Sequence, residues 1–338
     1  MPIMPTICLV PGDGIGQEVI PETARVLAAL CPDMRFTLAQ AGWEVFLRTG
    51  SALPEATVHA VAQADATLFG AIQSPTDGRV TPYRSPILDL RQRFDLYANL
   101  RPARGLLPEH PPIDLLIVRE NSEGLYVREE ESDGETAVAR RRITWRASLR
   151  IARVAFWHAR ARGGREGRPP LVTIVHKANV LPRTDGLFRA AAREAAEDFP
   201  DVQVEEMLVD AAAMKLVQDP ARFDVILAPN LYGDILSDLA AGLAGGLGLA
   251  PSSNLGDGPV ALFEPVHGSA PDIAGRGVAN PVAALLSGAM ALERLGRAEE
   301  ATRLRNAIHA VLYAGVRPPD LGGDATTVQF AEAVIHAL

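Results

Sequence analysis

ICLVPGDGIG, residues 7–16, is the stretch that decides the fold of this chain. It begins with Ile7–Val10, a short apolar run typical of a buried strand, and the apolar spacing of Gln17–Leu30 after it predicts a helix. The glycines between them suit a tight turn with positive φ. The turn is close to the dinucleotide pattern G-x-G-x-x-G, but Gln17 stands where the third glycine would fall. We therefore reject a standard Rossmann fold, and for Gly12–Gly16 we keep both a structural turn and a cofactor contact open.

The same alternation of short apolar runs and longer amphipathic stretches continues along the chain. It predicts an α/β fold with a largely parallel sheet. The further strands are expected at Ala66–Phe69, Leu115–Val118, Leu171–Val175 and Phe223–Ala228.

Two segments interrupt this rhythm, and a third stretch bears on the division into lobes. Arg128–Thr136 is highly charged and contains Asp133-Gly134, which predicts a hairpin or arm. Arg160–Pro170 is rich in Arg, Gly and Pro, which indicates a surface loop. The glycine-rich stretch Gly242–Gly258 is a candidate passage from one lobe to another.

Composition limits the class of protein. The 338 residues are 48% hydrophobic, enough for a sizeable core, and the length favours two lobes. A net charge of −8 argues against a nucleic-acid partner. Two cysteines do not make a disulfide framework, so a reducing compartment is expected. No leader and no long apolar segment is visible, and we expect a cytoplasmic protein without a membrane partner.

Three arginines are candidate anion-binding residues. Arg91 lies in a segment that starts with Pro86, Arg101 follows an apolar stretch, and Arg119 ends the strand Leu115–Val118. The carboxyl ends of strands are where sites of α/β proteins gather. Guanidinium groups bind carboxylates in a bidentate manner, although a single arginine is more often a surface ion-pair partner.

Tyr126 and Lys177 are candidates for proton transfer. A tyrosine hydroxyl can donate a proton if a nearby cation or metal lowers its pKa, and a lysine at a dry cleft can shuttle protons. The structural alternatives are a packed aromatic ring and a surface lysine.

Two carboxylates carry the strongest signal. Asp234 and Asp238 follow the strand Phe223–Ala228 at i and i+4, so a helix places both on one face. Hard oxygen donors there suit Mg²⁺ or Mn²⁺, with Asp210 as a candidate third ligand. The alternative is that acids near a helix N-terminus complement its dipole.

The segment Glu264–Ile273 is dense in Gly, Ser and Pro, which predicts a shaped loop. His267 is a candidate to stack on or hydrogen-bond a nucleotide. Asp272 is a candidate to accept from ribose hydroxyls and to repel a 2′-phosphate, which would select NAD over NADP. A plain structural loop is the competing interpretation.

Taken together, these motifs resemble the β-decarboxylating dehydrogenase family, which includes isocitrate, isopropylmalate, homoisocitrate and tartrate/malate dehydrogenases. The resemblance runs from Gly12–Gly16 to Asp320–Asp324. It implies a two-lobe, isopropylmalate-dehydrogenase-like fold: residues 1–98 and 250–338 form a large NAD-binding lobe, and residues 99–249 form a small lobe with a dimerisation arm. It also implies a homodimer or higher homo-oligomer, in which Lys177 and Asp210 reach into the partner's cleft.

The resemblance also implies roles for particular residues. Tyr126 and Lys177 would be catalytic, and Mg²⁺ or Mn²⁺ would be held by Asp210, Asp234 and Asp238. Substrate would be bound by Arg91, Arg101, Arg119, Tyr126, Lys177 and Asn179, and NAD by Glu264, His267, Gly268, Ser269, Ala270, Asp272 and Asn280. Regulatory subunits of the family typically lose the tyrosine or the lysine, so the presence of both favours an active enzyme.

The segment before Arg91 is expected to select the substrate, a hydroxy tricarboxylate. Its Ser85-Pro86-Ile87 pattern resembles homoisocitrate dehydrogenases, which implies conversion of homoisocitrate to 2-oxoadipate in lysine biosynthesis by the aminoadipate route. Some relatives carry an arginine where this chain has Leu88, so isopropylmalate, a step of leucine biosynthesis, or a broad isocitrate/malate-type activity is the alternative. We expect Arg84 or Ser85 to hold the distal carboxylate.

Overall fold

The computed structural model describes residues 4–73, 83–164 and 169–338, and it forms two compact units. Unit 1 comprises Met1–Leu96 and Gly245–Leu338, and unit 2 comprises Tyr97–Ala244. The chain therefore leaves unit 1 once and returns to it within the glycine-rich stretch singled out above. Each unit is described by itself.

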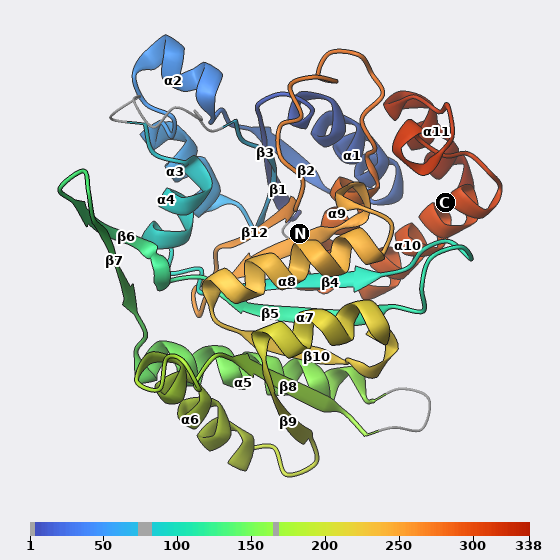
Figure 1. The fold of residues 1–338 in the computed structure, drawn as a ribbon. Coiled ribbons are helices and arrows are strands. Elements are labelled where there is room, and N and C mark those ends of the chain that lie inside the picture. Colours follow the sequence, from blue (N-terminus) through green and yellow to red (C-terminus); the bar gives the residue numbers. More distant parts are fainter. Residues whose placement is uncertain (1–3, 74–82, 165–168) are drawn as a thin grey trace. The chain divides into compact units, whose positions relative to one another are not determined.

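Unit 1 has a mostly parallel sheet in the strand order β2-β1-β3-β12-β11 (Figure 1). Only the β11–β12 pair is antiparallel among these strands. The strands are β1 (Thr6–Gly12), β2 (Arg35–Leu38), β3 (Ala66–Ala71), β11 (Pro251–Leu255) and β12 (Ala261–Pro265). The helices are α1 (Gly16–Leu30), α2 (Trp43–Thr49), α3 (Glu55–Gln63), α4 (Pro86–Arg93), α9 (Val282–Arg294), α10 (Ala298–Tyr313) and α11 (Thr327–Ala337), with short 3₁₀ turns at Leu247–Leu249 and Pro319–Leu321.

The turn between β1 and α1 has a structural reason for its glycines. Gly12 and Gly14 have φ of 76° and 55°. A Cβ on Gly14 would lie 2.0 Å from the carbonyl oxygen of Ser269. Between them, the Asp13 carboxylate accepts backbone N–H groups of Trp43 at 2.8 Å and Gln73 at 2.9 Å. These contacts support the interpretation as a tight turn, and the alternative of a cofactor contact stays a prediction.

In unit 2 the sheet strands lie in the order β4-β5-β10-β8-β9, and among them only the β4–β5 pair is antiparallel. The strands are β4 (Ala98–Arg104), β5 (Asp114–Glu120), β8 (Leu171–His176), β9 (Gln203–Leu208) and β10 (Val225–Ala228). The helices are α5 (Trp145–Arg162), α6 (Thr184–Glu197), α7 (Val209–Gln218) and α8 (Asn230–Leu243), with a 3₁₀ turn at Pro220–Arg222.

One face of this sheet is covered by α7 and α8. Alternate residues of a strand point to opposite faces, so Leu115 and Ile117 of β5 share a face with each other. They pack in one buried cluster with Ile226 of β10, Leu216 of α7 and Leu236 of α8. This packing fixes α8, which carries both predicted metal-binding aspartates, over the ends of β5 and β10.

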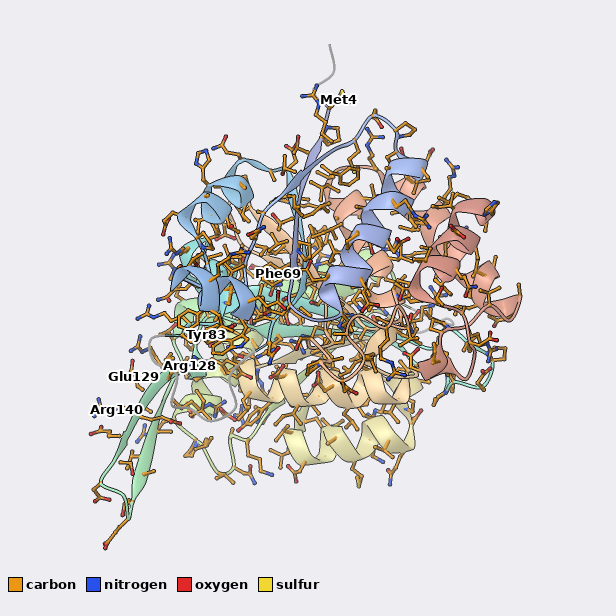
Figure 2. All side chains as sticks on the ribbon, turned by 90° about the horizontal axis from the view of Figure 1, so that it is seen from above. Met4, Phe69, Tyr83, Arg128, Glu129 and Arg140 are labelled. Atoms are coloured by element: carbon orange, nitrogen blue, oxygen red, sulfur yellow. The ribbon has the colours of Figure 1, made fainter. Side chains whose placement is uncertain are left out.

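The charged segment after Tyr126 is an antiparallel hairpin of β6 (Gly124–Ser132) and β7 (Ala137–Arg142). Asp133 and Gly134 lie at its tip, where the Asp133 carboxylate accepts the backbone N–H groups of Glu135 and Thr136. The hairpin projects away from the sheet of unit 2, and Figure 2 shows Arg128, Glu129 and Arg140 along it.

The predicted α/β class with a largely parallel sheet is confirmed, and three local predictions need adjustment. The strand expected at Phe223 begins at Val225, and Glu264 and Pro265, expected in a loop, end β12. The loop predicted at Arg160–Pro170 starts later because α5 continues to Arg162, and residues 165–168 of it lie outside the described residues.

Cys8 and Cys31 are buried free thiols. In the described part of the chain, no helix is both long and apolar enough to cross a membrane.

Candidate functional site

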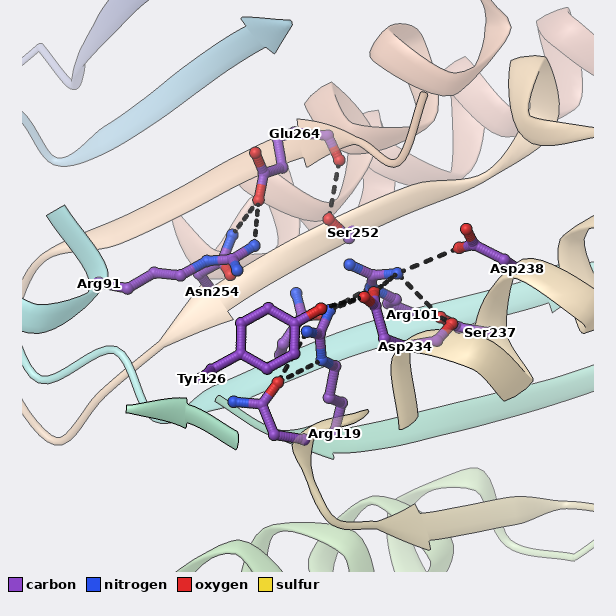
Figure 3. Close-up of polar contacts among 12 residues, drawn as sticks. Arg91, Arg101, Arg119, Tyr126, Asp234, Ser237, Asp238, Ser252, Asn254 and Glu264 are labelled. Carbon is purple, nitrogen blue, oxygen red and sulfur yellow. Dashed lines mark hydrogen bonds and ion pairs between the residues drawn. The ribbon is translucent and has the colours of Figure 1, made fainter. Parts of the chain in front are cut away.

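Arg119, in β5, is the centre of a polar cluster in unit 2. Its side chain is buried, so its charge requires partners. Its Nε and Nη2 donate to Asn230 Oδ1 at 3.1 and 2.7 Å, and its Nη1 donates to Asp234 Oδ1 at 2.5 Å (Figure 3). Gly233 allows this approach, because a Cβ there would lie 2.8 Å from the Arg119 Cβ.

Arg101, in β4, approaches the same helix. Its Nη1 lies 3.1 Å from Asp234 Oδ1 and 3.4 Å from Asp238 Oδ1, and donates to Ser237 Oγ at 2.8 Å. Its Nε donates to Asn99 Oδ1 at 2.6 Å. Two arginines therefore converge on the carboxylates of α8, as Figure 3 shows. The antiparallel pairing of β4 with β5 brings Arg101 beside the strand that carries Arg119.

Tyr126 joins this cluster from β6. Its hydroxyl donates to Asp234 Oδ2 at 2.5 Å, and its ring lies 5.0 Å from the Arg119 guanidinium carbon. Burial and the hydrogen bond to Asp234 raise the pKa of Tyr126, and the charge of Arg119 opposes this rise. From the sequence, proton donation by this hydroxyl was conditional on a nearby cation or metal that lowers its pKa, and this role stays a prediction. In the present geometry, burial has the largest effect on this pKa, and together with the aspartate it outweighs the cation.

The donor chemistry of α8 fits a hard divalent cation in part. Asp234 and Asp238 keep 30% and 55% of their side chains exposed, and both lie on one face of the helix. Among the described residues of one chain, however, no group of three or more His, Cys, Asp or Glu is placed to hold a metal ion. Asp210 therefore does not join the α8 pair within the same chain.

Lys177 and Asp210 contact each other. The Lys177 ammonium donates to Asp210 Oδ1, and this hydrogen bond lowers the pKa of the Asp210 carboxyl. Lys177 follows β8, and Asp210 lies in the first turn of α7. Asn179, a predicted substrate contact, is exposed two residues after Lys177.

In unit 1, Arg91 of α4 forms an ion pair with Glu264 of β12. Arg91 Nη2 lies 2.9 Å from Glu264 Oε1, with about a tenth of each side chain exposed. The same oxygen accepts from Asn254 Nδ2 at 2.8 Å. Glu264 was predicted to contact the cofactor, and in this structure its carboxylate is engaged by Arg91 and Asn254. The Arg91 Nε is buried without a hydrogen-bond partner among the described residues, which leaves a donor for an anion.

The predicted substrate-selecting residues lie at the start of α4. Arg84 is exposed, and Ser85 is the N-cap residue, although its side chain makes no capping hydrogen bond. Tyr83 donates to the Gln73 carbonyl oxygen at 3.0 Å and packs against Trp43 and Phe46.

The predicted cofactor loop follows β12. His267 Nε2 is buried without a partner in the described part of the chain, and burial lowers the pKa of the ring. The Ser269 carbonyl oxygen accepts the Ile15 N–H at 2.9 Å, which ties this loop to the glycine-rich turn. Ala270 has a φ of 38°, an uncommon conformation for a residue with a Cβ. Gly268 and Asp272 are exposed.

The side chain of Asn280 forms hydrogen bonds with other residues of the chain. Its Nδ2 donates to Asp320 Oδ2 at 3.0 Å, and its Oδ1 accepts the Val282 N–H at the start of α9. Its predicted place near an adenine stays a prediction.

Sequence reasoning missed the neutral side chains that organise the arginines. Asn230, Asn99 and Ser237 each accept from Arg119 or Arg101. Asn230 was the easiest of them to predict, because it comes two residues after a buried strand and starts the helix of the two aspartates.

The chain is similar to known dehydrogenases in sequence and in structure. A family model described as isocitrate/isopropylmalate dehydrogenase matches residues 6–334. An isocitrate/homoisocitrate dehydrogenase of Thermus thermophilus is 55% identical over 335 residues, 98% of this chain and of that protein. A 3-isopropylmalate dehydrogenase of Methanothermobacter thermautotrophicus is 47% identical over 336 residues, again 98% of both. The crystal structure of an isocitrate dehydrogenase from Methylococcus capsulatus has a TM-score of 0.91 at 41% identity and covers 99% of each chain.

Proposed function

The chain belongs to the isocitrate/isopropylmalate dehydrogenase family, and from this premise we propose that it oxidatively decarboxylates homoisocitrate to 2-oxoadipate with NAD and a divalent metal ion. That it is a β-decarboxylating dehydrogenase follows from the family match over the whole chain. The observation that carries the proposal is the convergence of Arg101, Arg119 and Tyr126 on Asp234.

Anion binding is supported by the arginines. Arg101 and Arg119 are held rigidly by neutral acceptors, so they lose little freedom when a carboxylate arrives. Arg91 offers its unpaired Nε. In a chain of net charge −8, the buried guanidinium groups of Arg101 and Arg119 in unit 2 support a site for a polycarboxylate.

The proton-transfer roles follow from the residue types. A divalent cation bound by Asp234, Asp238 and Asp210 of a second copy of the chain would stabilise negative charge on the substrate, while NAD would accept the hydride. Lys177, in its neutral amine form, is proposed to take the proton of the substrate 2-hydroxyl. Tyr126 is proposed to deliver its hydroxyl proton to the carbon that loses CO₂, with Arg119 stabilising the charge that remains.

Self-assembly is part of the proposal. Met214 and Val217 of α7 and Ile235 of α8 expose 50%, 59% and 56% of their surface. These apolar side chains support an interface between copies of the chain.

A mixture of Tyr126→Phe and Lys177→Met subunits tests whether sites are shared. Restored activity after the two inactive variants are refolded together is expected, and continued inactivity would contradict shared sites.

NAD is preferred in this proposal because Asp272 places an exposed carboxylate in the predicted cofactor loop. A carboxylate repels a 2′-phosphate. The test is kcat/KM with NAD and NADP for the native chain and for Asp272→Lys, which should move the preference toward NADP.

The substrate is tested by comparing kcat/KM for homoisocitrate, isocitrate, isopropylmalate and malate. We expect homoisocitrate to be preferred, and Arg84→Ala to reduce activity on homoisocitrate more than on malate. A wide advantage of isopropylmalate would contradict the assignment.

Isopropylmalate is the second candidate because Leu88 of α4 presents an alkyl group one turn before Arg91. Metal-dependent NADH production by the purified chain alone excludes a regulatory subunit.

A further inference from the structure

Asp185 is a fully buried carboxylate outside the polar cluster around Arg119. It lies in the first turn of α6, and its side chain is 0% exposed. A buried carboxylate is costly unless it is paired and hydrogen-bonded. Asp185 has both kinds of contact: Oδ2 accepts the backbone N–H of Lys177 at 2.6 Å, and Oδ1 forms an ion pair with Nη1 of Arg141.

The first contact holds the backbone of Lys177 from one side. From the other side, the Lys177 carbonyl oxygen accepts the N–H groups of Val180 and Leu181, each at 2.9 Å. Both backbone polar groups of Lys177 are therefore engaged. Because the direction of a side chain follows from its backbone, these bonds set the direction in which the Lys177 side chain leaves the turn after β8.

The second contact reaches the hairpin. Arg141 lies in β7, and only 13% of its side chain is exposed, whereas its neighbours Arg140 and Arg142 expose 67% and 59%. The Arg141 guanidinium carbon lies 5.0 Å from the centre of the Tyr232 ring in α8. Arg141 is thus the point at which the base of the hairpin contacts both α6 and α8.

We propose that Asp185 is a positioning residue for Lys177, and that its ion pair with Arg141 couples the orientation of this lysine to the placement of the β6–β7 hairpin. The inference rests on the proposed role of Lys177 in proton transfer. If the hairpin moved and withdrew Arg141, the Asp185 charge would remain buried without a counterion, and the turn that it holds would have to change.

The experiment measures kcat, KM and the midpoint of thermal unfolding for four variants of the full chain. Asp185→Asn keeps the size of the side chain but removes its charge. Arg141→Met and Arg141→Lys remove and retain the cation. Arg140→Met is the matched control, because its guanidinium is on the exposed part of the same strand.

We expect Asp185→Asn and Arg141→Met to lower kcat by about 10- to 100-fold, since a misplacement of about 1 Å costs rate on this scale. KM should change by less than about threefold, because the Arg101 and Arg119 contacts are untouched. Arg141→Lys should recover most of the loss, and Arg140→Met should behave as the native protein. Unchanged kcat in folded Arg141→Met, or no recovery by Arg141→Lys, would overturn the inference.

Lys177→Met separates this inference from the proposed function. If Lys177→Met retains native turnover, the role of Lys177 itself is wrong. If Lys177→Met is inactive while Asp185→Asn and Arg141→Met turn over normally, only the positioning role is wrong. Should Asp185→Asn fail to fold, the Arg141→Met and Arg141→Lys pair decides the question alone.

Discussion

Glu123 gives a prediction that does not depend on the substrate. This carboxyl lies just before β6, is buried, and accepts the backbone N–H of Thr144 at 2.9 Å and its hydroxyl at 3.0 Å. Burial, together with the nearby charge of Glu120, raises the pKa of Glu123 from 4.5 to about 7, against the opposing effects of Thr144 and Arg150.

A raised carboxyl pKa makes the folded protein more stable at low pH than at high pH. The folded state holds the proton more tightly than the unfolded chain, so the stabilising effect is complete below pH 4.5 and is lost as the pH rises through about 7. A rise in pKa of about 2.5, at about 1.36 kcal/mol for each pH unit, amounts to about 3 kcal/mol.

The test is the change Glu123→Gln, which keeps an acceptor for Thr144 and cannot ionise. Unfolding free energies from urea titrations should be compared with the native protein between about pH 4.5 and pH 8. The difference in unfolding free energy should move by about 3 kcal/mol in favour of the variant at the higher pH. Glu130→Gln, an exposed carboxylate on the same strand, serves as the control. If the difference between native protein and Glu123→Gln is the same across this pH range, the reasoning is refuted.

Three further changes test the site and its framework. Tyr126→Phe should lower kcat by about 10²- to 10⁴-fold with little change in KM, measured from NADH production, and a loss below tenfold would contradict its role as proton donor. Glu264→Gln should cost about 3 kcal/mol in the unfolding free energy, because Arg91 loses its counter-charge, and an unchanged denaturation midpoint would refute this. Gly14→Ala should destabilise by more than about 2 kcal/mol, because its Cβ would lie 2.0 Å from the Ser269 oxygen, whereas Gly242→Ala, with open space around it, should not destabilise.

Much of the site could be predicted because its residues lie at positions that local structure defines. Asp234 and Asp238 share a face as soon as the segment is helical, and Arg119 ends a buried strand whatever the rest of the chain does. Their mutual contacts through Arg101 and Tyr126 depend on the antiparallel β4–β5 pair and on the hairpin, which local patterns do not position. The neutral acceptors Asn99, Asn230 and Ser237 carry no such pattern, and were missed.

Other predictions depended on which distant segments meet. The family resemblance implied a cofactor contact for Glu264, which stays a prediction, but the sequence could not show its ion pair with Arg91, which lies 173 residues earlier. Likewise, the sequence could not show that burial, together with the Asp234 carboxylate 108 residues away, raises the pKa of Tyr126.

Some features were determined by the sequence alone, because periodicity and turn chemistry act between neighbouring residues. They are the order of strands and helices, the glycine-rich turn, the hairpin around Asp133 and the spacing of the α8 aspartates. The tertiary structure alone decided that Arg141 meets Asp185, that Asp185 holds the Lys177 backbone, and that Glu123 is buried beside Glu120. Such pairings depend on the packing of whole elements, and the energy of a charge depends on what surrounds it after folding.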